Sequence, residues 1–300
     1  MKTVLTLDGG SGRGRYSFGM CNLIADNSDK PLSSIFDLIV SVSVGSWIGA
    51  LIAFGKLNSH EQRMEIEKDL NLNSAQTFIT KNKHGPWASP KYDGIGKRNV
   101  IKRYFDEKIK LGDAIVPFVI LCSSLGGKDR VFKSWDEKDA EISLVELLDA
   151  TSAIPSYFPP VKIHHLNEIL MDGGVISNRP LELAFIVARR LFGRTIEFKI
   201  LSIGTQVICE LQTKVEDISK LGLINWAKLG LFDIIAGVGN TISIQLMDEL
   251  LGEERFLRIA CECAFVKTDI MDESSNKIIQ TSIDKTWKNQ KTNILQFLAK

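Results

Sequence analysis

Short apolar runs alternate with segments of helical apolar spacing along most of this 300-residue chain. Runs rich in β-branched residues predict buried strands, and apolar residues three or four positions apart predict helices that bury one face. Because the two patterns alternate, we predict a three-layer α/β/α sandwich with a mainly parallel central sheet. The predicted strands are 4–7, 38–42, 115–123, 130–134, 169–171, 197–203 and 256–260, and the predicted helices are 15–25, 46–54, 61–80 in two pieces, 97–109, 144–151, 181–191 and 282–298.

One domain is predicted for residues 1–300, since no internal repeat, low-complexity tract or clear linker divides the chain. Its motifs fall within about residues 4–206, and residues 207–300 are expected to complete the same domain. A proline- and glycine-rich segment, residues 84–96, predicts a long loop of the kind that forms lids or binding segments. Residues 226–251 are apolar with helical spacing and predict a further helical region.

Composition and charge narrow the function classes. The 37 basic and 36 acidic residues give a net charge of +1, which is unlike the basic profile of nucleic-acid-binding proteins. Pairs such as Lys97-Arg98 are interpreted as solvated surface. Five cysteines at scattered spacing predict reduced thiols, with neither a zinc motif nor a disulfide framework. No secretory apolar region follows Met1, and the most apolar window, residues 38–54, is too short to span a bilayer, so we expect an intracellular, cytoplasmic protein.

The first candidate site is the junction between the predicted strand 38–42 and the helix that follows it. Ser43 stands on the turn, and Gly45 follows two positions later, as a nucleophile elbow requires. Such a turn is strained and exposes the serine hydroxyl above the sheet. Ser41 occupies the position where the usual pattern has glycine, but it is also small. An ordinary strand-to-helix turn is the alternative interpretation.

A glycine-rich segment, residues 8–14, follows the first predicted strand directly. Its four glycines allow several backbone N–H groups to converge on one point, where a phosphate or the oxyanion of a reaction intermediate could bind. A dinucleotide site is the rival interpretation. That site needs an acidic residue at the end of the next strand, whereas Asp37 stands at the beginning of it.

The third candidate is Asp172, which ends a short predicted strand and precedes Gly173 and Gly174. It could cap a turn, or it could be the base that a serine nucleophile requires. Histidine is the usual base, and in an α/β-hydrolase it follows the acid in the sequence. All four histidines of this chain, His60, His84, His164 and His165, precede Asp172. The alternative is a dyad in which the carboxylate takes the serine proton directly.

Taken in order, these stretches resemble the patatin-like phospholipase family. That family has an Asp-Gly-Gly-Gly-x-Arg-Gly loop, a Gly-x-Ser-x-Gly elbow and a distant Asp-Gly-Gly, which correspond to residues 8–14, 41–45 and 172–174. Residues 150–160, ATSAIPSYFPP, are similar to a further family segment, and Asn178-Arg179-Pro180 is similar to its Asn-x-Pro. The resemblance covers nearly the whole chain and implies the patatin-like fold.

The resemblance also implies roles. Ser43 would be the acyl-accepting nucleophile and Asp172 its base, in a hydrolysis that passes through an acyl-serine intermediate and needs no metal or organic cofactor. The oxyanion hole would be formed by backbone N–H groups of Gly9, Gly10, Ser11 and Gly12. Supporting positions of the motifs are Asp8, Arg13, Gly14, Ser41, Gly45, Gly173 and Gly174. Ser11 and Ser41 replace family glycines, and each costs on the order of 1 kcal/mol if its position needs a positive φ.

The implied substrate is a phospholipid or lysophospholipid, with peripheral membrane contact and no nucleic acid partner. Residues 226–251 and the loop around Trp87 are candidates for an acyl-chain pocket or lid, or for ordinary core packing. Two other functions remain open: a catalytically weak lipid-binding or scaffold protein on the same fold, and an acyltransferase that hands the acyl group to an alcohol.

Overall fold

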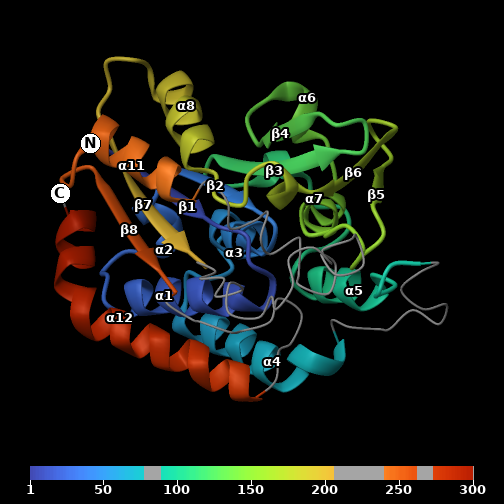
Figure 1. Ribbon diagram of the computed structural model, residues 1–300, viewed down its shortest axis with the longest axis horizontal. Coiled ribbons are helices and arrows are strands. Elements are labelled where there is room, and N and C mark those ends of the chain that lie inside the picture. The colour runs from blue at the N-terminus through green and yellow to red at the C-terminus, as the bar shows by residue number, and fades with distance from the viewer. Residues whose placement is uncertain (78–88, 206–239, 262–272, 300) are drawn as a thin grey trace, which may run out of the picture.

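The computed structural model describes residues 1–77, 89–205, 240–261 and 273–299, which form an eight-stranded sheet between two layers of helices (Figure 1). This arrangement confirms the predicted three-layer α/β/α sandwich. The strands are β1 (Lys2–Leu7), β2 (Leu38–Val42), β3 (Phe118–Ser124), β4 (Asp129–Lys133), β5 (Val161–Ile163), β6 (Glu168–Asp172), β7 (Phe198–Gly204) and β8 (Phe256–Ala260). The α-helices are α1 (Gly14–Asp26), α2 (Leu32–Ile35), α3 (Val44–Ala53), α4 (His60–Thr77), α5 (Ile95–Tyr104), α6 (Glu137–Ala140), α7 (Leu144–Thr151), α8 (Leu181–Phe192), α11 (Asn240–Leu251) and α12 (Glu273–Ala299), and short 3-10 helices are η1 (Ser11–Arg13), η2 (Leu111–Asp113) and η3 (Gly173–Val175).

The centre of the sheet is parallel. Strands β3, β2, β1, β7 and β8 lie side by side in that order and all run in the same direction. Every residue of β2 and β7 is buried, because helices cover both faces of a parallel sheet and leave no polar side to the strands. Strands β4, β5 and β6 pair antiparallel and extend the sheet beyond β3.

Alternate residues of each central strand belong to two separate cores. Val4 and Leu38 pack on one face with Met247 of α11 and with α8. Leu5 and Ile39 point to the other face and join a larger core that includes residues of α1, α3, α5, α7 and α12. Figure 1 shows α8 and α11 on one side of the sheet, and α1 and α12 on the other. The period of two along each strand therefore produces the two helical layers.

Strands β2 and β6 meet end to end along one edge of β3. Strand β2 pairs parallel with the first part of β3, up to Val42 opposite Leu121, and β6 pairs antiparallel with the last part, where Asp172 lies opposite Cys122. Strand β4 pairs with residues from both parts and so occupies the opposite edge. Since β2 and β6 run toward each other, the residues at their ends converge above the middle of β3.

Several predicted boundaries were wrong. Helix α5 ends at Tyr104, well before residue 109, because Phe105 turns to an extended conformation and is buried in the core. Helix α12 begins at Glu273, nine residues before the predicted start at 282, and α4 is continuous from His60 to Thr77. Strand β5 was not predicted, since three residues carry too little pattern. The predictions for residues 226–239 and for the loop around Trp87 lie outside the described residues.

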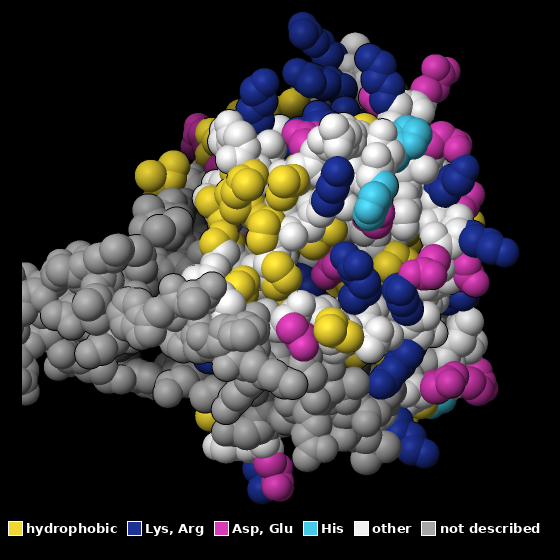
Figure 2. All heavy atoms as spheres, turned by 90° about the vertical axis from the view of Figure 1, so that its right-hand side faces the viewer, with side chains coloured by type: hydrophobic (Ala, Val, Ile, Leu, Met, Phe, Trp, Pro, Cys, Tyr) yellow, Lys and Arg dark blue, Asp and Glu magenta, His cyan; other side chains and the backbone are white. Residues whose placement is uncertain are grey.

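Charged and apolar side chains share one face of the molecule. Figure 2 shows acidic and basic side chains interspersed on the face that forms the right-hand side of Figure 1, together with a group of exposed apolar side chains.

The described cysteines differ in their state. Cys21 and Cys122 are free and buried, whereas Cys261 is disulfide-bonded, so the prediction of reduced thiols fails at Cys261. Within the described part of the chain, no helix combines the length and the hydropathy needed to cross a bilayer.

Candidate active site

Ser43 lies on a strained turn between β2 and α3. Its φ of 55° and ψ of −132° fall in a region that residues with side chains rarely occupy. The first turn of α3 lies so close to β1 that a Cβ on Gly45 would come within 2.5 Å of the Leu7 carbonyl oxygen and 2.6 Å of that of Asp8. Only glycine fits there, which explains the small residue two positions after the serine. The turn is thus strained at Ser43 and closely packed at Gly45, the two features that the prediction of a nucleophile elbow requires.

The Ser43 hydroxyl donates a hydrogen bond of 2.7 Å to Oδ2 of Asp172. The other carboxylate oxygen, Oδ1, accepts the N–H of Gly174 at 2.7 Å, at the start of η3. Both Ser43 and Asp172 are buried, with 4% and 1% of their surfaces exposed. Burial raises the pKa of Asp172 to about 6, although the hydrogen bonds from Ser43 and Gly174 and the Lys97 ammonium act in the opposite direction. Residues 129 positions apart therefore form the contact on which the dyad hypothesis depends.

The two serines that replace family glycines behave differently. Ser41 lies within β2, and its φ is not among the positive values of the described chain. Its buried hydroxyl donates to the Val119 carbonyl at 3.1 Å and contacts the Ser46 hydroxyl at 3.0 Å. Ser11, in contrast, has a φ of 50°, so the expected cost of about 1 kcal/mol applies at Ser11 alone.

The glycine-rich loop lies beside Ser43 and is anchored at Gly9. The N–H of Gly9 donates to the Asn178 carbonyl at 3.0 Å, and the Gly9 carbonyl accepts the Thr205 hydroxyl. The next three residues, Gly10 to Gly12, use none of their N–H groups in hydrogen bonds to the residues that the structure describes. Those three groups are therefore open to an acceptor, whereas that of Gly9 is occupied.

The remaining predicted positions support these turns. Asp8 is buried and binds Arg258 at 2.6 Å and Arg179 at 3.4 Å. Arg13 is buried at the end of η1, and Gly14 begins α1 against the side chain of Val44. The sequence pattern singled out Asp8 but gave no indication that arginines from two later segments would hold it.

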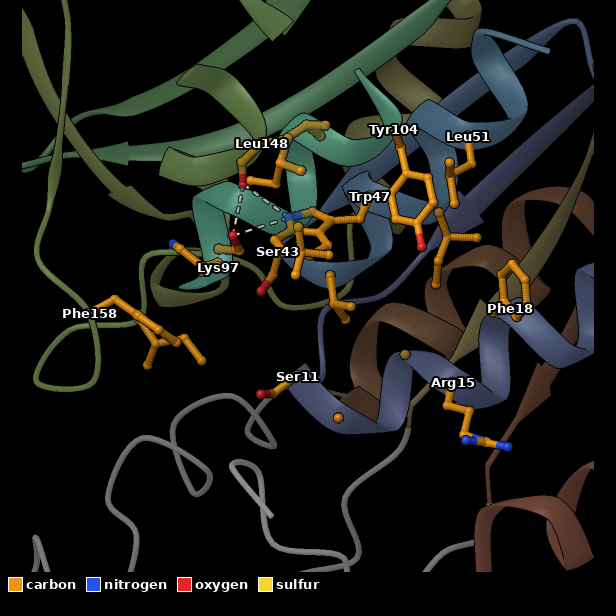
Figure 3. Close-up of a pocket in the computed structure, with 18 of the residues that line it drawn as sticks. Ser11, Arg15, Phe18, Ser43, Trp47, Leu51, Lys97, Tyr104, Leu148 and Phe158 are labelled. Carbon is orange, nitrogen blue, oxygen red and sulfur yellow. Dashed lines mark hydrogen bonds between the residues drawn. The ribbon is translucent and has the colours of Figure 1, made fainter. Parts of the chain in front are cut away.

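An apolar cavity of about 150 Å³ opens beside Ser43. Figure 3 shows side chains of α1, α3, α5 and α7 around it. The Trp47 indole is held in place by hydrogen bonds to the Leu148 carbonyl at 3.1 Å and the Ser152 hydroxyl at 3.2 Å. Apolar lining residues labelled in Figure 3 are Phe18, Trp47, Leu51, Tyr104, Leu148 and Phe158. Helix α11, the described part of the segment 226–251, does not line this cavity, because it packs on the opposite face of the sheet.

Lys97 is a buried cation on the wall of the same cavity. Its ammonium donates to the Asp149 carbonyl at 2.7 Å and pairs with the Asp149 carboxylate at 3.0 Å. Burial lowers the pKa of Lys97, while Asp149 and, more weakly, Asp172 raise it. Arg98 binds the other oxygen of Asp149 at 2.6 Å and is half-exposed. The interpretation of Lys97-Arg98 as solvated surface is therefore wrong for Lys97. Lys97 lies three and four positions before the buried residues Val100 and Ile101, and this spacing could have indicated that it is on the inner face of α5.

Histidine does not contribute to this site within the described residues. His60, His164 and His165 are all exposed, and the first two contact Asp26 and Glu146 at the surface. The described residues also contain no group of three or more His, Cys, Asp or Glu side chains arranged to hold a metal ion.

Comparison with known proteins gives a consistent set of relatives. A family model described as patatin-like phospholipase matches residues 5–185, more than half of the chain. The chain is 24% identical over 263 residues to a cGAMP-activated phospholipase from Pseudomonas aeruginosa, covering 84% of this chain and 76% of that protein. It is 27% identical over 263 residues to Patatin-11 from Solanum tuberosum, covering 75% and 66%.

More distant matches extend further along the chain. Calcium-independent phospholipase A2-gamma from Rattus norvegicus is 21% identical over 296 residues, which cover 91% of this chain but 36% of that protein. Among solved structures, VipD from Legionella pneumophila aligns with 99% of this chain and 66% of its own, at 12% identity and a TM-score of 0.44.

Proposed function

Because this chain belongs to the patatin-like phospholipase family, we propose that it hydrolyses fatty-acyl esters of lipids, with Ser43 as the nucleophile and Asp172 as its base. The observation that carries the proposal is the 2.7 Å hydrogen bond from the Ser43 hydroxyl to the Asp172 carboxylate, on a strained elbow beside an apolar cavity. The names of the relatives, phospholipase and patatin, support a lipid substrate.

In the first step, Ser43 Oγ attacks the acyl carbonyl carbon while its proton passes to Asp172. The tetrahedral intermediate collapses, the bond to the leaving alcohol breaks, and Asp172 returns the proton to that alcohol. Water then attacks the acyl-serine carbonyl, again losing a proton to Asp172. Collapse of the second intermediate releases the fatty acid, and the proton returns to Ser43 Oγ. Asp172 is suited both to accept and to return the proton, because burial brings its pKa to about 6, closer to neutrality than the pKa of an exposed aspartate.

The negative charge that develops on the carbonyl oxygen needs donors that are already in place. We assign this role to the N–H groups of Gly10, Ser11 and Gly12, since the N–H of Gly9 is bonded to Asn178. Preorganised donors of this kind contribute about 10²- to 10³-fold each to the rate. Ser11 and Gly12 also line the cavity, which agrees with a carbonyl bound between the loop and Ser43.

The apolar cavity is the proposed site of the fatty-acyl chain, because its lining gains more from contact with methylene groups than with water. Exposed apolar residues next to the site, Ile95 at the start of α5 and Val175 and Ile176 after Asp172, suit peripheral contact with a lipid surface. Figure 2 shows a group of exposed apolar side chains on the face that forms the right-hand side of Figure 1, the side on which α5 lies. Phospholipids and lysophospholipids are the proposed substrates, and an intracellular location belongs to the same proposal.

The test is covalent labelling with a fluorophosphonate probe, followed by peptide mass spectrometry. We expect the label on Ser43, its loss in Ser43→Ala, and its retention in Ser46→Ala, which changes a serine in the first turn of α3. Hydrolysis of a short-chain nitrophenyl ester should fall by about 10³-fold or more in both Ser43→Ala and Asp172→Asn.

An unlabelled Ser43 in a protein that binds liposomes would instead identify a lipid-binding or scaffold protein. Transfer of the acyl group to an added acceptor lipid in preference to water would identify an acyltransferase that uses the same acyl-serine.

A further inference from the structure

The carboxylate of Asp8 is the centre of a buried charge cluster at the end of β1. Its Oδ2 accepts from Nη2 of Arg258 at 2.6 Å and from Nε of Arg179 at 3.4 Å, and its Oδ1 lies 3.4 Å from Nη1 of Arg258. All three side chains are buried, with 7% or less of their surfaces exposed. A buried carboxylate held by two guanidinium groups is fixed in position, because leaving any of these charges unpaired would be costly.

Arg258 reaches Asp8 by crossing the neighbouring strand. It lies on β8 opposite Ser202 of β7, and its Nη1 donates to the Ser202 hydroxyl at 2.6 Å on the way to β1. The guanidinium passes over Gly204, where a Cβ would lie 2.0 Å from Nη2 of Arg258 and 2.9 Å from Oδ2 of Asp8. The absence of a side chain at Gly204 therefore leaves the space through which Arg258 of β8 reaches the start of the glycine-rich loop.

The residue after Asp8 is held just as closely. Gly9 accepts the Thr205 hydroxyl, donates to the Asn178 carbonyl at 3.0 Å and accepts from the Asn178 amide at 3.4 Å. Asn178 and Arg179 follow the Asp172 turn, so one short segment links the loop to the proposed base. Asp8 and Gly9 together fix the backbone that immediately precedes the open N–H groups of Gly10 to Gly12.

We propose that Arg258 is a positioning residue for acyl transfer, which acts through Asp8 to hold the oxyanion loop against Ser43. The inference rests on the proposed function. Arg258 lies beyond residues 5–185, the part of the chain that the family model matches. It contacts neither Ser43 nor the proposed acyl site, and its effect would come from the geometry of the loop that it anchors.

The experiment compares Arg258→Met and Asp8→Asn with Arg255→Met, a matched control on an arginine whose Nε donates to the Leu251 carbonyl, away from the loop. Turnover of a short-chain nitrophenyl ester, the rate of fluorophosphonate labelling of Ser43 and the thermal midpoint are measured for each. We expect Arg258→Met to lower kcat and the labelling rate together, by about 10- to 100-fold, with KM within about twofold of the wild type, because an oxyanion is bound only after attack.

Asp8→Asn should give the same pattern, and the double variant should be no slower than the slower single variant, since both changes break one unit. Arg258→Lys keeps the charge and replaces Arg258→Met in the comparison if the latter does not fold. A lowered thermal midpoint with kcat and labelling rate per folded protein within twofold of the wild type would overturn the proposal. Failure to label Ser43 in the wild type would overturn the proposed function instead, so the two failures are distinguishable.

Discussion

The hydroxyl of Thr151 accepts the backbone N–H of Ser43 at 2.9 Å and donates to the Leu121 carbonyl at 2.7 Å. Thr151 ends α7, and Leu121 is the residue of β3 opposite the end of β2. One hydroxyl therefore joins the strained serine turn to the strand on which both β2 and β6 terminate. The N–H of Ser43 takes part in neither the hydrogen bonds of the sheet nor those of α3. The Thr151 hydroxyl therefore supplies the acceptor that this buried donor needs.

Replacing Thr151 with valine keeps the shape but removes the hydroxyl. We expect Thr151→Val to lower the free energy of unfolding by about 1–3 kcal/mol, since a buried N–H and a buried carbonyl lose their partner. The rate of fluorophosphonate labelling of Ser43 should fall by about tenfold, because the elbow is no longer fixed. Thr286→Val, which removes a hydroxyl bonded to Tyr16 at the contact of α1 with α12, is the control and should leave the labelling rate unchanged.

The raised pKa of Asp172 predicts how activity depends on pH. The base must be ionised to accept the Ser43 proton, and its pKa is about 6 because of burial. We therefore expect kcat/KM for a neutral ester to fall about tenfold per pH unit below about pH 6 and to level off above pH 7. A profile that stays flat from pH 5 to pH 7 would contradict the assignment of Asp172 as the base.

Lys97 should determine the position of the acid limb of this profile, which is the pH range below about pH 6 where kcat/KM falls. Its buried ammonium lowers the pKa of Asp172, opposing the effect of burial, and Cys122, opposite Asp172 on β3, is buried and neutral. Lys97→Met removes the positive charge, so the pKa of Asp172 rises and the acid limb moves to higher pH. Arg98→Gln removes a cation that binds the same Asp149 but does not act on Asp172, and it should leave the limb in place. Equal profiles for Lys97→Met and the wild type would contradict this role.

The parts of the site that lie close together in the sequence were predictable, because neighbouring residues determine their conformation. A β-branched run, a small residue, Ser43, Gly45 and a helical pattern all fall within one strand-turn-helix unit, and the strain at Ser43 is resolved inside that unit. Asp172 was a candidate because of the two glycines that follow it, and the absence of any later histidine left a carboxylate base open; the family resemblance then implied that role. Its contact with Ser43 depends on β6 pairing antiparallel with β3, and the sequence contains no signal of that direction.

The contacts that tie the site together were not predictable. Arg258, Thr205 and Asn178 reach the glycine-rich loop from segments more than 160 residues away. The sequence singled out Asn178 by its resemblance to the family's Asn-x-Pro, but nothing in these segments indicated that any of the three would contact the loop. The end of α5 was missed for a similar reason. Residues 105–109 continue a helical pattern, but burial of Phe105 in the core outweighs the weak preference for another helical turn.

The position of Leu51 predicts a limit on acyl-chain length. Leu51 lines the cavity eight residues after Ser43, which places it about 12 Å further along the direction of α3. Leu51→Trp adds bulk far from the reacting carbonyl, so butyryl esters should be cleaved within about twofold of the wild-type rate. Esters of long chains, such as palmitoyl, should lose about tenfold or more in kcat/KM, because the distal methylene groups no longer fit. Ile186→Trp, on the exposed side of α8, is the control and should change neither rate. Equal losses on short and long esters would show that the acyl chain of the substrate does not extend past Leu51. The acyl chain would then have to bind on another part of the surface around Ser43.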